Sequence, residues 1–240
     1  EAASYLPFDG KPTPENVQSA LASAEAQLAK LNPDATSEAD AKALLAVFAS
    51  AKSYGEYYQL TGDPGFGEVY RKLLIGYANF LNRYPTEAKA QLNERSNMWS
   101  DGDTFVQNWT VLEASPLFSA NERKQIVSAI YLTYEANARD GYLAKAEERA
   151  PRWNHEIFPA LSLLAGSVYF QNYYQLPQAP EWRRLGERIF TGNTSHISLD
   201  EGSDYLMHVP MTNIDYAMAS GNLDFMTRSL RPSADLNALM

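Results

Sequence analysis

The residues best suited to chemistry lie in the stretch RWNHEIFP, which begins at Arg152 and contains one of only three histidines in the 240-residue chain. Apolar residues follow it at helical spacing, and proline is tolerated near the first turn of a helix. The sequence therefore predicts a helix that starts close to Asn154 or His155. Free backbone amides and the positive end of the helix dipole favour an anion at such a start, and Arg152 and His155 add donors. A carboxylate ligand fits this position. In the alternative interpretation, Asn154 is only a helix cap and His155 a half-buried first-turn residue.

A second polar cluster, LDEGSDYLMHVP, ends at Pro210 and precedes another apolar stretch. Pro210 predicts a helix that starts just after the polar residues. If the two helices start on the same side of the molecule, four side chains converge on one site: Asn154, His155, Tyr205 and His208. The alternative is that residues 200–204 form a solvated loop and that Tyr205 is a half-buried aromatic residue.

A third cluster, NMWSDGD, puts Trp99 beside Asp101 and Asp103. A tryptophan ring near acids and amides suits a sugar-binding cleft, where the ring face stacks on the sugar and polar groups bond its hydroxyls. Asp-Gly-Asp is also an ordinary turn and capping sequence. The chain contains no complete acidic calcium loop, no His-Glu-x-x-His motif and no cysteine, so we expect neither a metal nor another cofactor.

The elements that must position these residues are helices of ten to twenty residues separated by Pro, Gly, Asn or Asp clusters, without strand alternation. The pattern predicts helices over approximately 14–31, 37–60, 66–83, 104–114, 120–139, 156–176, 179–191 and 209–220. Without a strict heptad, such helices favour antiparallel pairs in a toroid or solenoid. We therefore expect an all-α fold in a single domain spanning residues 1–240.

Composition excludes some classes of partner. The chain has 29 acidic and 20 basic residues, a formal net charge of −9, and no run of Lys or Arg, so neither nucleic acid nor an anionic membrane is an expected partner. No stretch approaches the ~18 consecutive apolar residues of a membrane span. The chain begins without Met and lacks Cys, which indicates a processed or trimmed chain and is compatible with export.

Several segments taken together resemble the α/α-toroid domain of polysaccharide lyases, such as the heparinase II/III-like and alginate lyases. These segments are YGEYYQLTGDPGFGEVYRKLLIGYANFL, PLFSANERKQIVSAI, RWNHEIFPALSLLAGSVYFQNYY and LDEGSDYLMHVPMTNIDYAMASGN. The resemblance covers approximately residues 40–225. Its sharpest element is the Asn-His pair opening a long helix, followed by an acidic, Gly-containing loop with Tyr.

The resemblance implies an incomplete α/α toroid that cleaves uronic-acid polysaccharides by β-elimination. Removal of the proton beside a carboxylate requires that the carboxylate charge be neutralised, a role that falls to Asn154 and His155. Tyr205 is the expected base, and also the acid that protonates the glycosidic oxygen. Nearby cations, Arg152 and His208, favour its phenolate form.

The same resemblance implies further substrate contacts and a location. The expected substrate-binding residues are Arg152, Trp99, Trp153 and Glu201. The partner is an acidic polysaccharide or oligosaccharide, met in the periplasm or after secretion. Because such lyases commonly carry a further β-sandwich domain and a further catalytic histidine or arginine, the chain is expected to be a fragment, a single-domain member or an inactive relative. A net acidic chain also needs a locally basic cleft, and the arginines available for it are Arg149, Arg152, Arg183, Arg184, Arg228 and Arg231.

Two alternatives remain open from the residues themselves. The first is a glycoside hydrolase on the same toroid, with two carboxylates drawn from Asp101, Asp103, Glu201 and Asp204; a separation of ~6.5–9.5 Å would suit an inverting mechanism. The second is a non-catalytic module in which aromatic residues hold a glycan without further chemistry.

Overall fold

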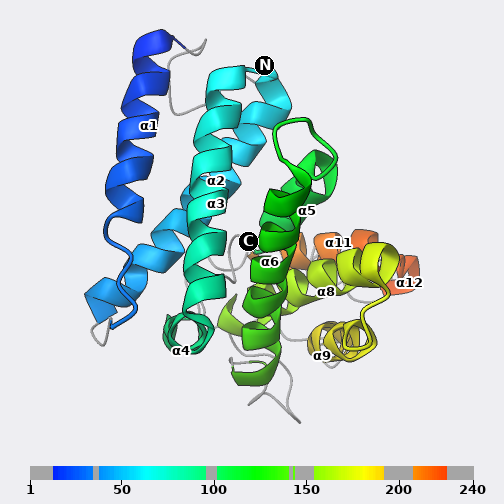
Figure 1. The fold of residues 1–240 in the computed structure, drawn as a ribbon. Helices are drawn as coiled ribbons and strands as arrows, with labels where there is room; N and C mark the ends of the chain where they lie inside the picture. The colour runs from blue at the N-terminus through cyan, green and yellow to red at the C-terminus, as the bar shows by residue number, and fades with distance from the viewer. Residues whose placement is uncertain are drawn as a thin grey trace, which may run out of the picture. The chain divides into compact units, whose positions relative to one another are not determined.

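The computed structural model of the protein describes residues 13–34, 38–95, 102–140, 143, 154–191 and 208–225. Within these ranges the chain is helical and contains no strand (Figure 1), which confirms the predicted all-α class. The helices are α1 (Pro14–Leu28), α2 (Glu38–Thr61), α3 (Pro64–Arg83), α4 (Pro85–Arg95), α5 (Gly102–Leu112), α6 (Ala120–Asp140), α8 (Asn154–Tyr174), α9 (Ala179–Thr191), α11 (His208–Ser220) and the short α12 (Leu223–Phe225). The chain divides into two compact units, unit 1 with residues 1–95 and 104–136, and unit 2 with residues 96–103 and 137–240.

The eight predicted helices are all present close to their expected bounds. The sequence pattern does not predict α4, because a Tyr84-Pro85 pair after an apolar helical stretch is typical of a helix end. In the structure Pro85 is the first residue of α4, a position where the missing N–H of proline costs nothing. The amide of Ala88 donates to the carbonyl of Tyr84 at 2.9 Å, which closes the first turn of this helix.

The core of unit 1 is built around α3, whose long apolar face is buried against α1 and α2. In Figure 1, α1 runs alongside α3, and α2 crosses behind it. Gly55 in α2 allows a close approach, because a Cβ at this position would lie 3.0 Å from the ring of Tyr70. On the same turn of α2, Tyr54 and Tyr57 pack on Phe66, with ring centroids 6.0 and 5.8 Å away. The pairing of α2 with α3 thus depends on the aromatic side chains of Phe66 and Tyr70 in α3.

The start of α3 is fixed by Asp63. One carboxylate oxygen of Asp63 accepts hydrogen bonds from the amides of Gly65 at 2.9 Å and Phe66 at 3.1 Å. These are two of the amide groups that the first turn of a helix leaves without a helical partner. Pro64 occupies the first helical position, where its fixed φ favours the helix.

Replacing Asp63 with Ala is therefore expected to lower the free energy of unfolding by about 1 kcal/mol, since two amide hydrogen bonds lose their acceptor. Urea unfolding followed by circular dichroism measures this change. Asp63→Asn is the matched control, because its side-chain oxygen can still accept from the same amides. An alanine variant as stable as the asparagine variant would contradict the role of this cap.

A second cap orders the start of α6. The Ser119 amide donates to Glu122 Oε2 at 2.8 Å, and the Glu122 amide donates to Ser119 Oγ at 3.3 Å, which is a reciprocal capping box. The hydrogen bond from the Ser119 backbone, together with Arg71, lowers the pKa of Glu122. Arg71 of α3 also pairs directly with Glu122 and so ties α3 to the start of α6 within unit 1.

A buried hydrogen bond joins α3 to α6 deeper in unit 1. Tyr77 and Thr133 are both fully buried, and their hydroxyl oxygens are 2.7 Å apart. Thr133 Oγ1 donates to the carbonyl of Ala129 at 2.8 Å, so Tyr77 is the donor to Thr133. Burial raises the pKa of Tyr77 far above its ordinary value, which keeps the hydroxyl neutral and able to donate.

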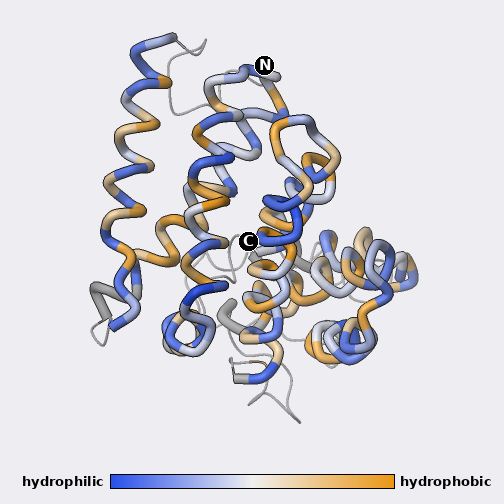
Figure 2. The backbone as a smooth tube through the Cα atoms, in the orientation of Figure 1, coloured by the Kyte–Doolittle hydropathy of each residue, from blue (hydrophilic) through white to orange (hydrophobic). Residues whose placement is uncertain are grey.

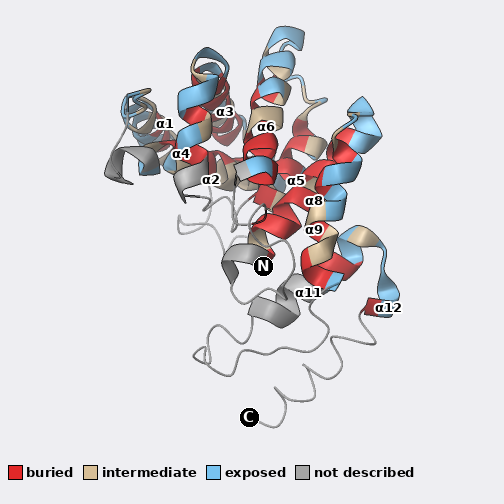
Figure 3. Cartoon of the chain, turned by 90° about the horizontal axis from the view of Figure 1, so that it is seen from below, coloured by how far each residue is buried: buried red, intermediate tan, exposed pale blue. Residues whose placement is uncertain are grey.

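Unit 2 contains α8, α9 and α11, which pack together. The described side chains of α8 are mostly buried up to Phe170, whereas its last turn is exposed (Figure 3). By contrast α9 has a buried side and a charged outer side, and hydrophobic and hydrophilic residues alternate along its turns in Figure 2. An apolar helix covered by an amphipathic one is the arrangement expected of a central helix and an outer helix.

The contact between α8 and α9 depends on Gly186. A Cβ at this position would lie 2.7 Å from the carbonyl oxygen of Ala160, and the backbone atom that it meets cannot rotate away. Glycine at residue 186 therefore lets the two helices approach more closely than any side chain would allow.

Replacing Gly186 with Ala is expected to lower the free energy of unfolding by about 1–2 kcal/mol. The overlap with Ala160 costs about 1–3 kcal/mol, and the better helix propensity of Ala returns only part of it. Thermal and urea unfolding measure the change. Gly76→Ala is the control, because the nearest neighbours of its new Cβ are the Cδ and Cγ atoms of the flexible Leu28 side chain and not backbone atoms. If Gly186→Ala proves more stable than the unmodified chain, the close contact is not a constraint.

Candidate functional site

The direction of α9 relative to α8 follows from contacts at both ends of the pair. Residues 175–178 form the short connection between the two helices. Near it, the rings of Phe170 and Trp182 meet edge to face with centroids 5.6 Å apart. Further along, Gly186 lies against Ala160, nearer the start of α8. The two helices therefore run antiparallel, as the sequence predicts for paired helices.

The direction of α11 follows in the same way. Tyr216 stacks on Phe190 at the end of α9, with ring centroids 4.4 Å apart and an interplanar angle of 7°. Four residues later, the carbonyl of Ser220 accepts from Arg183 Nη2 near the start of α9, at 3.4 Å. Hence α11 is antiparallel to α9 and parallel to α8, and the amino-terminal ends of α8 and α11 lie at the same end of this helix group.

The structure places three of the predicted site residues at these two helix starts. Asn154 and His155 are the first two residues of α8, and His208 is the first residue of α11. Both predicted helix starts are confirmed. Pro159 lies inside α8, and its carbonyl accepts from Asn137 Nδ2 at 3.3 Å. The first part of α8 is therefore held against the end of α6 within unit 2.

The remaining predicted site residues are not covered by the structure. Five lie outside the described residues: Trp99, Arg152, Trp153, Glu201 and Tyr205. For the hydrolase alternative, the same holds for Asp101, Asp204 and Glu201, whereas Asp103 is the second residue of α5.

Two of the arginines expected to form a basic cleft are paired with carboxylates on their own helix. Arg183 Nε lies 2.8 Å from Glu187, and Arg184 binds Glu181 with two hydrogen bonds of 2.7 and 2.8 Å. The bonds from Arg184 lower the pKa of Glu181. Because these pairs neutralise the outer side of α9, that side does not supply a strongly positive surface.

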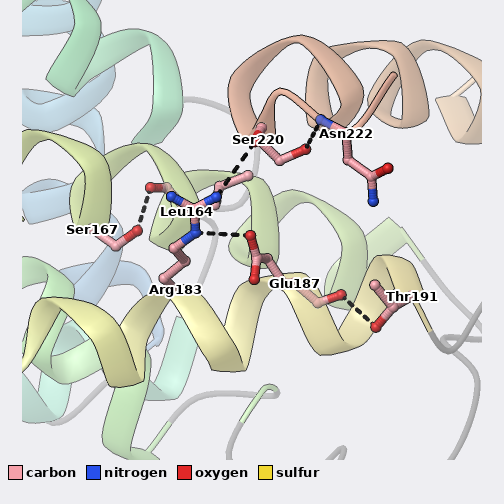
Figure 4. A network of polar contacts seen from close by, with 7 residues as sticks. All are labelled: Leu164, Ser167, Arg183, Glu187, Thr191, Ser220 and Asn222. Atoms are coloured by element: carbon pink, nitrogen blue, oxygen red, sulfur yellow. Dashed lines mark hydrogen bonds and ion pairs between the residues drawn. The ribbon is translucent and has the colours of Figure 1, made fainter. Parts of the chain in front are cut away.

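A pocket that sequence reasoning missed lies where α8, α9 and α11 meet, at the end remote from the two helix starts. It has a volume of about 320 Å³ and is lined by Ser167, Val168, Gln171, Asn172, Ala179, Pro180, Arg183 and Ala219. Figure 4 shows Arg183 between Glu187 and the carbonyl of Ser220, with Ser167 nearby on α8. No motif marks these residues, since amides on a helix usually face solvent.

Two properties of the described residues bear on the class of site. Among the parts of the chain that the structure covers, no group of three or more His, Asp or Glu side chains is arranged to hold a metal ion. Within the same parts, no helix is long and apolar enough to cross a membrane. On α11, partial burial raises the pKa of Asp215.

Comparison with family models, with curated proteins and with solved structures finds no match for this chain.

Proposed function

We propose that the protein is a lyase that cleaves uronic-acid polysaccharides by β-elimination, with its site at the amino-terminal ends of α8 and α11. The observation that carries the proposal is the parallel course of these two helices, deduced from the Phe190–Tyr216 stack and the Arg183–Ser220 hydrogen bond. It supports a common location for two polar clusters that are far apart in the sequence.

Two parallel helix starts suit an anionic substrate. Each start directs free backbone amides and the positive end of a helix dipole towards the same region. A uronate carboxylate bound there has its charge partly neutralised, which is the requirement for removing the neighbouring proton. In this mechanism Asn154 and His155 hold the carboxylate, and His208 lies at the start of the second helix.

The proton transfers complete the reaction. Tyr205, as phenolate, removes the proton next to the carboxylate, and the electron pair left behind expels the glycosidic oxygen. Tyr205 then returns a proton to that oxygen. The products are a shortened chain and a second chain that ends in an unsaturated uronate. Arg152 and His208 favour the phenolate form of Tyr205 by their charge.

The arrangement of unit 2 also supports the finer fold assignment, an α/α toroid. In a toroid built from helical hairpins, successive inner helices run parallel and each outer helix runs against them. The relation of α8, α9 and α11 has this form, with the mostly buried α8 as an inner helix and the amphipathic α9 as an outer one. An enzyme of this kind would act in the periplasm or outside the cell, where acidic polysaccharides are found.

The experiment that tests the function is an absorbance assay for the unsaturated uronate. The protein is incubated with alginate, ulvan, heparin and hyaluronan, and the unsaturated-uronate band is recorded with time. We expect at least one polysaccharide to give a rising signal. A flat signal from the folded protein across the panel would contradict the proposal.

A further inference from the structure

The pocket between α8, α9 and α11 has the construction of a small-molecule site. Its wall is apolar on three helices, with Val168 from α8, Ala179 and Pro180 from α9, and Ala219 from α11. Polar side chains of α8 and α9 line the same pocket. An apolar wall with a few convergent polar groups is the usual composition of a ligand site.

The polar groups retain capacity for hydrogen bonds. Gln171 and Asn172 are exposed, and within the described residues neither amide has a hydrogen-bond partner. Arg183 uses Nε for Glu187 and Nη2 for Ser220, so part of its five-donor guanidinium group remains available (Figure 4). Two amides and a guanidinium together can both donate to and accept from a ligand.

The pocket carries little net charge, so it is not suited to binding a simple anion. The guanidinium of Arg183 is 2.8 Å from the carboxylate of Glu187, so the pair is close to neutral. A ligand held here is bound mainly by hydrogen bonds and by contact with the apolar wall, and a negative charge on it adds little. Polyols with apolar C–H faces match this combination of groups.

The volume of the pocket limits the size of the ligand. The volume of about 320 Å³ is at the lower end of the range of about 300–1,000 Å³ for small-molecule pockets. We infer that the pocket binds one pyranose residue of a glycan chain, with the ring on Val168 and Ala219 and its hydroxyls on Gln171, Asn172 and Arg183. The choice of a sugar as the ligand rests on the proposed function, whereas the shape and polarity of the pocket are independent of it.

The pocket is separate from the proposed reaction centre. Asn172 is 18 residues beyond Asn154 on the same helix, which corresponds to about 27 Å at 1.5 Å per residue. A sugar bound in the pocket is therefore not the one that reacts. The pocket acts as a second attachment point, which keeps a long chain on the protein between cleavage events and lowers the KM for polymers more than for short oligosaccharides.

The test uses side-chain amide signals in NMR spectra of the whole chain. Alginate, hyaluronan and malto-tetrasaccharides are titrated in turn, and the amide signals of Gln171 and Asn172 are followed. We expect at least one tetrasaccharide to shift these signals, with an affinity that changes less than about twofold between about 50 mM and 500 mM NaCl because charge contributes little. If no tetrasaccharide shifts either signal, the inference is wrong.

Single-residue variants distinguish binding in the pocket from binding elsewhere on the protein. Asn172→Ala is expected to weaken binding about five- to tenfold through lost hydrogen bonds, and Ala219→Trp is expected to abolish it by filling the pocket. Gln107→Ala, which removes an exposed helical amide in unit 1, is the matched control and should leave affinity unchanged. Binding that survives Ala219→Trp would overturn the inference.

The same samples are assayed for the unsaturated product, so that the two proposals fail separately. Pocket-sensitive binding without product would support the pocket and contradict the lyase. Product formation without any response of Gln171 and Asn172 would support the lyase and overturn the pocket.

Discussion

Replacing Tyr205 with Phe is expected to reduce kcat for polysaccharide cleavage by about 10²–10⁴-fold, the usual contribution of a positioned acid–base group. Phenylalanine retains the ring but removes the hydroxyl that takes and returns the proton. KM should change little, because the resemblance assigns substrate binding to other residues. Initial rates from the unsaturated-uronate absorbance, measured over a range of substrate concentrations, give both constants.

Two controls make this result specific. The circular dichroism spectrum and unfolding midpoint of Tyr205→Phe should equal those of the unmodified chain, so that lost activity is not lost structure. Tyr173→Phe is the matched variant, since Tyr173 is an exposed tyrosine at the far end of α8; its kcat should be unchanged. Full activity in Tyr205→Phe would remove this residue from the mechanism.

The second large effect concerns stability. Thr133→Val should lower the free energy of unfolding by about 1–3 kcal/mol, because it leaves the fully buried Tyr77 hydroxyl without an acceptor. Valine has nearly the shape of threonine, so the packing between α3 and α6 is otherwise preserved. Urea unfolding of the purified variant measures the loss.

A double-mutant cycle distinguishes this hydrogen bond from general packing. Tyr77→Phe should cost less, about 0.5–1.5 kcal/mol, because Thr133 Oγ1 still donates to the carbonyl of Ala129. The double variant should be more stable than Thr133→Val alone, since no buried hydroxyl is then left unpaired. Additive losses in the double variant would show that the two hydroxyls do not interact.

The helices were predictable because local signals agree with the fold. Thr13 before Pro14, Asp63 before Pro64, and the Ser119–Glu122 pair are start signals that can be interpreted without tertiary structure, and the structure contains the corresponding caps. The failure at α4 has a physical cause. Proline both ends and begins helices, and the burial of Ala88 and Leu92, which favours a helix after Pro85, depends on tertiary structure.

The candidate site was predictable only in part. Pro159 and Pro210 located the starts of α8 and α11, but their common end depends on contacts between residues far apart in the sequence, such as Phe190 with Tyr216. The pocket beside Arg183 was missed because its residues come from three helices and form no local motif. The pairing of Arg183 with Glu187, by contrast, has a local signal, since the two residues are four positions apart on one helix.

The central claim is that cleavage is an elimination, and the mass of the products tests it most directly. The protein is incubated in heavy-oxygen water with whichever polysaccharide it degrades, and the oligosaccharides are analysed by mass spectrometry. We expect the new non-reducing end to be lighter than that of a hydrolysis product by one water molecule. Analysed before the reducing end exchanges its oxygen with water, the products should contain no solvent oxygen. Products that gain one heavy oxygen per cleaved bond, at the new reducing end, with no loss of water at the other new end, would contradict the lyase and identify a hydrolase.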